Sequence, residues 1–107
     1  MILYTLDETG TPVIEKDVIK WAKWLETADR RIALDEIDGI VISTIFFGIN
    51  IQLLKSMKKP LLFETMVFRN GKGAETIRAA TKEEAIIQHN KMVQLIKLER
   101  EAETGSM

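Results

Sequence analysis

The chain has 107 residues, of which 46% are hydrophobic and 29% are charged, and its formal net charge is -1. This length suits one ordinary domain with a single core, and this balance favours a folded chain over a disordered one. The small net charge argues against a nucleic-acid binder with a basic surface and against an acidic mimic of DNA. We expect one domain over residues 1–100 and a flexible tail over 101–107.

The sequence contains no cysteine. This excludes disulfides, thiolate metal sites and cysteine nucleophiles, and it suits a reducing compartment. The first residues do not form a signal peptide, and no apolar run approaches the roughly 18 residues that cross a bilayer. We therefore expect a cytoplasmic protein that uses no membrane, metal or cofactor.

The N-terminal third predicts a strand, a turn and a helix. Residues 2–6 carry the β-favouring types Ile, Tyr and Thr, and residues 7–12 include a glycine and a proline that end the strand. From Asp17 the apolar residues follow helical spacing, and the Asp17 carboxylate is suited to accept from the first free backbone amides. We expect one amphipathic helix over residues 17–29.

The clearest local signal is a hairpin centred on Asp38 and Gly39. This pair between two β-rich runs favours a type I′ turn, which needs positive φ at both central residues. The turn sets a register in which two sets of apolar residues lie on opposite sides. One side holds Ile37, Ile40, Ile42 and Phe46, and the other holds Ile32, Leu34, Val41, Ile45 and Phe47.

The second half predicts a connection, a strand, an edge strand and a helix. Residues 48–59 are assigned as a connection with at most one helical turn, 61–68 as a strand ended by the glycine-containing segment 69–73, and 76–79 as a short edge strand. Thr81 and Glu84 form a capping box that opens a helix ending near Arg100. The fold class expected is α+β, with a small antiparallel sheet of three to five strands and both amphipathic helices packed on one face.

His89 is the only histidine, and it lies on the apolar face of the last helix. The spacing predicts a structural histidine at the edge of the core with one ring nitrogen bonded to backbone or threonine. Acid–base catalysis is the functional alternative. One histidine without cysteine or a spaced carboxylate motif is a poor metal site.

Glu64 and Thr65 interrupt an otherwise apolar strand. We expect Glu64 to point outward or to pair with Arg30 or Arg31, since carboxylates are rarely buried alone. The functional alternative is a pocket for a small nucleotide-like ligand, built from these four residues.

Several stretches of the chain form a recognisable combination: Leu-Leu-Phe-Glu-Thr-Met-Val-Phe at 61–68, Leu-Tyr-Thr-Leu-Asp at 3–7, Trp21 with Trp24, Arg30 with Arg31, and 81–89. Together they resemble a family of short uncharacterised proteins encoded in phage and prophage genomes, and the segment 61–68 is the most specific part. The resemblance covers nearly the whole chain. It implies a small accessory protein of a mobile element, where inhibition of host defence is a common role, and it supplies no catalytic residue.

The leading hypothesis is a protein without enzymatic activity that binds and blocks a host or defence protein, in the manner of an anti-CRISPR protein. The alternatives are a binder or sponge of a nucleotide-like ligand and a small hydrolase built on His89 and Glu64. Two helices with one apolar stripe each cannot cover both sides of the sheet, so we also expect a homodimer. The alternative is that the connection over residues 48–59 folds over the second side and buries it within one chain. The residues predicted to contact a partner or ligand are Arg30, Arg31, Ile40, Ile42, Phe46, Glu64, Thr65 and His89.

Overall fold

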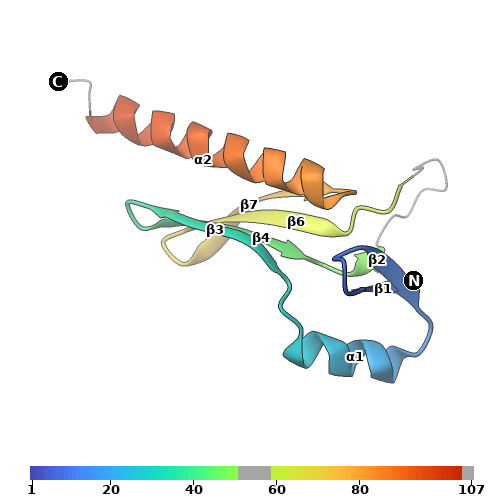
Figure 1. Ribbon diagram of the computed structural model, residues 1–107. Coiled ribbons are helices and arrows are strands. Elements are labelled where there is room, and N and C mark those ends of the chain that lie inside the picture. The colour runs from blue at the N-terminus through green and yellow to red at the C-terminus, as the bar shows by residue number, and fades with distance from the viewer. Residues whose placement is uncertain (51–58, 105–107) are drawn as a thin grey trace.

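The computed structural model describes residues 1–50 and 59–104. The described chain forms two antiparallel sheets and two helices, which Figure 1 shows as an elongated assembly. A four-stranded sheet has the order β3-β4-β6-β7, and a three-stranded sheet has the order β2-β1-β5. The strands and helices are β1 (Ile2–Leu6), β2 (Pro12–Glu15), α1 (Val18–Thr27), β3 (Arg31–Ile37), β4 (Ile40–Phe46), β5 (Ile49–Asn50), β6 (Phe63–Arg69), β7 (Lys72–Ala79) and α2 (Lys82–Thr104).

Two tight hairpins build the four-stranded sheet. Asp38 and Gly39 join β3 to β4 with φ of 49° and 82°, the left-handed pair that a type I′ turn requires. Asn70 and Gly71 join β6 to β7 with φ of 53° and 76°. The predicted β3–β4 register is confirmed from the Ile37–Ile40 pair back to the pair of residues 33 and 44.

A bulge near the start of β3 then shifts this register by one residue. Arg31 pairs with Ile45 instead of Phe46, and Ile32 packs against the cluster around Phe46. Ile32 therefore lies on the same side of the sheet as Phe46, whereas the uninterrupted register predicted it on the opposite side. The extra residue of a bulge changes the face on which the next side chain lies.

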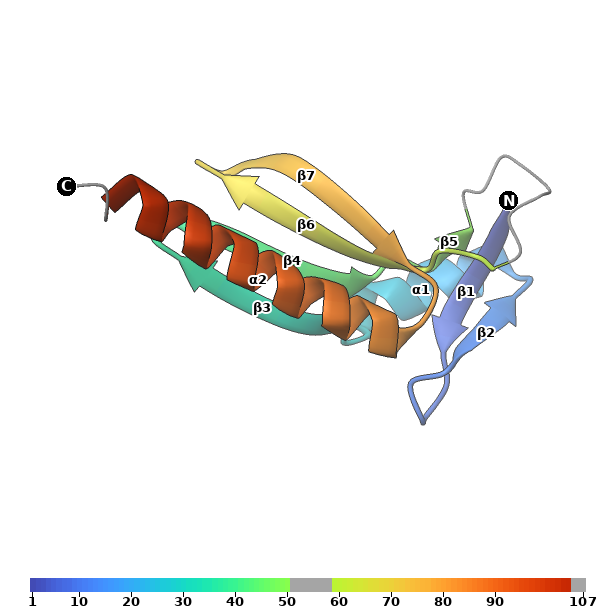
Figure 2. The ribbon, with the colours of Figure 1, turned by 90° about the horizontal axis from the view of Figure 1, so that it is seen from above.

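Helix α2 runs along one face of the four-stranded sheet, as Figures 1 and 2 show. Its buried residues Met92, Val93 and Ile96 pack with the buried side chains of β4 and β6 around Ile42 and Val67. At its N-terminus, the Thr81 hydroxyl accepts from the amide of Glu84 at 3.1 Å. The Glu84 carboxylate accepts from the amide of residue 80, which completes the predicted capping box one residue early.

The three-stranded sheet and α1 form the other end of the molecule. Strand β1 pairs with β2 on one side and with β5 on the other, and α1 packs on β1 and β2. The Trp21 indole donates to the carbonyl of Tyr4 at 3.0 Å, and Trp24 meets Phe46 edge-on. In Figure 1, α1 lies on the opposite side of the molecule from α2.

Gly48 carries the chain from one sheet to the other. Its φ is 78°, and a Cβ there would lie 3.0 Å from the carbonyl oxygen of Tyr4 and 3.2 Å from the ring of Phe46. The Tyr4 amide donates to the Gly48 carbonyl at 2.8 Å, which starts the pairing of β5 with β1. Only glycine combines that backbone conformation with so close an approach.

The expected fold class is therefore wrong. The strands form two sheets instead of one, and the helices pack on different sheets instead of on a shared face. Two short strands, β2 and β5, were not predicted, and without them β1 has no separate sheet to join. Helix α2 also continues to Thr104, beyond the expected end near Arg100. The rest of the predicted connection, residues 51–58, lies outside the described residues.

Candidate functional site

A chain of buried polar side chains ties α2 to the sheet. The Thr44 hydroxyl lies 2.6 Å from that of Thr65 and 2.7 Å from Nδ1 of His89. On the other side of the ring, His89 Nε2 lies 2.7 Å from a carboxylate oxygen of Asp35. If Nε2 of His89 donates to Asp35, Nδ1 accepts from the Thr44 hydroxyl, and the Thr44 oxygen accepts from the Thr65 hydroxyl. Each of these three hydrogen bonds then has one donor and one acceptor.

This order of hydroxyl, imidazole and carboxylate is also found where a nucleophile is activated. Here the Thr44 residue is fully buried and His89 is 1% exposed, whereas the Asp35 side chain is 51% exposed. The hydroxyl therefore lies between α2 and the sheet, where a substrate does not reach it. The prediction of a buried His89 bonded to a threonine is confirmed.

The sequence reasoning missed Asp35 as the partner of His89. A signal was present, because Asp35 pairs with Ile42 in the hairpin register and so lies on the side that α2 covers. A carboxylate at such a position lies within reach of a polar side chain on the sheet-facing side of α2. The only histidine of the chain is that side chain.

Glu64 forms an ion pair, although not with the expected arginines. Its carboxylate lies 2.9 Å from a guanidinium nitrogen of Arg78, its partner on β7. The Arg78 guanidinium also lies 4.6 Å from the centre of the Phe47 ring, a cation–π contact. Because neighbouring residues of a strand point to opposite faces, Glu64 and Thr65 are separated by the sheet.

The two predicted arginines also lie apart from Thr65. Arg30 donates to the carbonyl of Phe46 at 3.1 Å and thereby ties the end of α1 to β4. Arg31 lines a hollow of about 420 Å³ between the two ends of the molecule. The described structure does not gather Arg30, Arg31, Glu64 and Thr65 around one pocket, which corrects the expected arrangement.

Ile40, Ile42 and Phe46 were expected to contact a partner, and all three lie in the core instead. Their exposed fractions are 8%, 0% and 0%. The hairpin register was right, but it does not say which of its two faces receives a helix. Since α2 covers the face that carries these residues, the alternate face is the one that no helix within residues 1–50 and 59–104 covers.

We call that uncovered side the open face. Among the described residues, α2 is the only helix that runs along the four-stranded sheet. Helix α1 packs on β1 and β2 and reaches β4 through the contact of Trp24 with Phe46. The strand alternation and register place these side chains on the open face: Arg31, Leu34, Glu36, Val41, Ser43, Ile45, Glu64, Met66, Phe68, Thr76 and Arg78. Leu34 is 47% exposed, and the apolar residues of the central strands are partly exposed.

The middle of the open face alternates large and small residues. Met66 and Phe68 lean over Gly73 of β7, where an added Cβ would lie 2.9 Å from the Met66 sulfur. Ser43, the partner of Met66 on β4, is the small residue on the other side. The open face therefore combines partly exposed apolar surface with an ion pair within the chain, Glu64 with Arg78.

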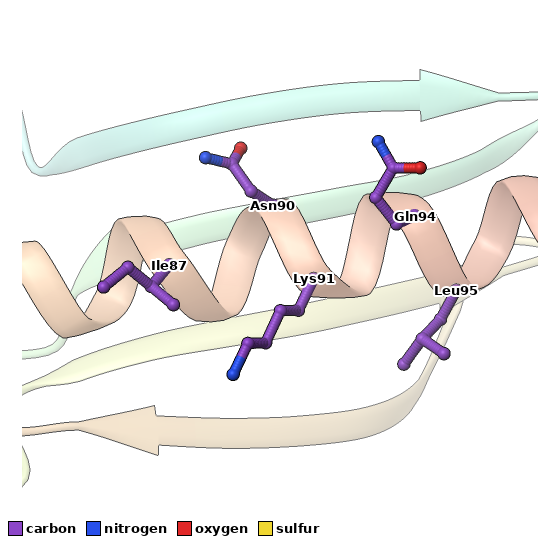
Figure 3. Close-up of a pocket in the computed structure, with 5 residues that line it drawn as sticks. All are labelled: Ile87, Asn90, Lys91, Gln94 and Leu95. Atoms are coloured by element: carbon purple, nitrogen blue, oxygen red, sulfur yellow. The ribbon is translucent and has the colours of Figure 1, made fainter.

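A second apolar surface follows the outer side of α2. Ile87, Leu95 and Leu98 are each more than half exposed there. Figure 3 shows Ile87, Lys91 and Leu95 projecting along one flank of the helix, with Asn90 and Gln94 on the other. This outer stripe of α2 is only one helix wide, whereas the open face spans four strands.

One ionic cluster fastens the far end of α2 to the sheet. Arg69 of β6 bonds Glu99 of α2 at 2.6 Å and Glu75 of β7 at 3.0 Å. The hydrogen bond from Arg69 lowers the pKa of the Glu99 carboxyl, and the same bond raises the pKa of Arg69. In the β1–β2 turn, the hydrogen bond from the Thr9 side chain lowers the pKa of Asp7.

Residues 1–50 and 59–104 contain no group of three or more histidine, cysteine or acidic residues placed to hold a metal ion. Neither described helix combines the length and the apolar character that crossing a membrane requires. No protein-family model, curated protein or solved structure matches the chain.

Proposed function

We propose that this protein acts by binding another protein, and that the open face is its binding surface. The observation that supports the proposal is the contrast between the two sides of the four-stranded sheet. One side is sealed by α2, while the other leaves apolar side chains such as Leu34, Val41 and Met66 in contact with solvent. Contiguous exposed apolar surface on a small protein is typical of an interaction site.

The resemblance to phage-encoded proteins gives the partner a context. In that setting the bound protein belongs to the host or to its defence, the protein acts in the host cytoplasm, and binding blocks the partner's own contacts. The proposal needs no catalytic group. It assigns the Thr44–His89–Asp35 chain to holding α2 in place, which fits the complete burial of the Thr44 hydroxyl.

The alternative of a nucleotide-like ligand has weaker support. The hollow beside Arg31 also contains Lys82, but three carboxylates lie around the same space, those of Asp7, Glu8 and Asp29. A phosphate bound there would face these carboxylates at short range, which costs electrostatic energy. The alternative of a hydrolase is weaker still, because Glu64 and His89 lie on opposite sides of the sheet.

Paired affinity capture from host lysate tests the proposal. The bait proteins are the wild type, Val41→Lys on the open face, and Leu98→Lys on the outer stripe of α2. We expect one protein to be enriched by the wild type and by Leu98→Lys but not by Val41→Lys. Capture that survives Val41→Lys and fails with Leu98→Lys would move the binding surface to α2 and overturn the proposal.

A further inference from the structure

We propose that the open face also binds the open face of a second copy of this chain, in a two-fold symmetric dimer. This inference rests on the proposed function, because it names one partner of the same surface. In this dimer the two four-stranded sheets pack face to face, with the exposed apolar side chains of β4 and β6 between them. The two α2 helices form the outer layers.

Shape is the first argument for a second copy. Sheets pack face to face about 10 Å apart with their strands nearly aligned, and a two-fold interface needs a surface that complements itself. With the axis parallel to the strands and midway between β4 and β6, each β4 lies over β6 of the other copy. Ser43 of one copy then faces Met66 of the other, so a small side chain meets a large one.

Charge is the second argument. Two identical surfaces repel each other if they carry unpaired charge of one sign. On the open face the Glu64 carboxylate is neutralised by Arg78 of the same chain at 2.9 Å. Glu36 is the remaining carboxylate, and its place on the edge strand β3 sets it opposite Gly73 of β7 in this arrangement. Neither acidic group meets its own copy. Arg31, the register partner of Ile45, adds one positive charge to the same face, so its four charged groups (Arg31, Glu36, Glu64 and Arg78) sum to zero.

Area sets the expected strength. Seven residues at about 3.3 Å each and four strands at about 4.8 Å give roughly 450 Å² of sheet per copy, or about 900 Å² in the pair. That is below the range of stable complexes and within the range of weak ones. We therefore expect a dissociation constant in the micromolar range, with monomer and dimer both present in ordinary samples.

Sedimentation of the purified full chain from about 1 μM to about 200 μM tests the dimer. We expect the wild-type mass to rise from one chain toward two. Val41→Lys should remain monomeric throughout, because it places an unpaired cation in the interface of both copies. Leu98→Lys is the matched control, with the same new charge on α2, and should dimerise like the wild type. If the circular dichroism spectrum shows that Val41→Lys is unfolded, Met66→Gln takes its place as the interface variant.

A wild type that keeps the mass of one chain at about 200 μM overturns the dimer. So does a dimer that Leu98→Lys breaks and Val41→Lys leaves intact, which would assign self-association to the outer stripe of α2. A monomeric wild type whose lysate capture still depends on Val41 would overturn the dimer alone and leave the proposed function standing. If the wild type dimerises but lysate capture is unchanged by Val41→Lys, the dimer stands and the proposed function is overturned.

Discussion

The two faces of β4 differ although their residues are of similar types. Toward α2, Ile40, Ile42, Thr44 and Phe46 are each at most 8% exposed. On the other side, Val41, Ser43 and Ile45 are partly exposed. A strand that is apolar on both faces is typical of a sheet covered on both sides. Here the chain supplies one cover as α2, and we propose that another protein supplies the second.

Replacing one phenylalanine on each face gives the largest expected contrast. Phe46 packs edge-on against Trp24 and Phe63, with ring centres 5.8 Å and 5.3 Å away. Phe46→Ala should lower the free energy of unfolding by about 3–5 kcal/mol. Phe68→Ala on the open face should cost clearly less in dilute solution, because its ring keeps part of its exposure. Equal shifts in urea midpoint would show that the open face is packed as tightly as the core.

A pair of neighbouring polar residues gives the next contrast. Thr44→Val keeps the shape but leaves His89 Nδ1 and the Thr65 hydroxyl without their shared partner. We expect a loss of roughly 1–3 kcal/mol in the free energy of unfolding. Ser43→Ala, one residue away on the open face, should change it by less than about 0.5 kcal/mol. Urea unfolding of both variants checks this. An unchanged urea midpoint for Thr44→Val would show that the buried hydrogen bonds of Thr44 with Thr65 and His89 do not help to hold α2 on the sheet.

The cap of the covering helix comes third. Thr81→Ala removes the acceptor for the amide of Glu84 and should cost about 0.5–2 kcal/mol. Thr81→Ser keeps the hydroxyl and should restore most of the stability. Thermal unfolding followed by circular dichroism separates the two. If both variants lose equally, the methyl group and not the cap accounts for the effect.

The smallest expected effect concerns acid. The pKa of Glu99 is lowered from its usual 4.5 in the folded chain, chiefly by the hydrogen bond from Arg69. Its stabilising contribution is therefore present above that value and is lost as the pH falls below it. Glu99→Gln should melt slightly below the wild type at neutral pH, and the two should converge in acid.

Glu101→Gln is the control for that titration, because Glu101 makes no ion pair among the described residues. It should follow the wild-type melting temperature across the same pH series. A difference between Glu99→Gln and the wild type that persists unchanged in acid would show that the Arg69 bond is not its cause.

Local signals in the sequence predicted the local structure well. The Asp38–Gly39 turn, the cap at Thr81 and the helical spacing around His89 each act within a few residues, and all three are confirmed. The assembly of these parts depends on contacts between distant residues. An apolar stripe on α1 indicates that the helix packs, but it does not indicate on which sheet.

The missed features have the same origin. Strand β5 has two residues, and it pairs with β1 directly after Gly48 turns the chain away from β4. Such a short strand leaves no periodic pattern to find. Likewise, choosing Ile42 as a contact residue required knowing which side α2 covers, and a hairpin register alone treats its two sides as equivalent.

Methionine oxidation compares the two faces of the sheet within one sample, because Met66 lies on the open face and Met92 lies under α2. Peroxide reacts with methionine sulfur according to its exposure, and mass spectrometry reads each site separately. We predict that Met66 is oxidised faster than Met92 in dilute protein, and that Met66 becomes several-fold slower in concentrated protein while Met92 does not change. Equal rates for the two sulfurs would show that the open face is as well covered as the face under α2 and would contradict the proposed binding surface. A Met66 rate that does not depend on concentration would contradict the dimer alone.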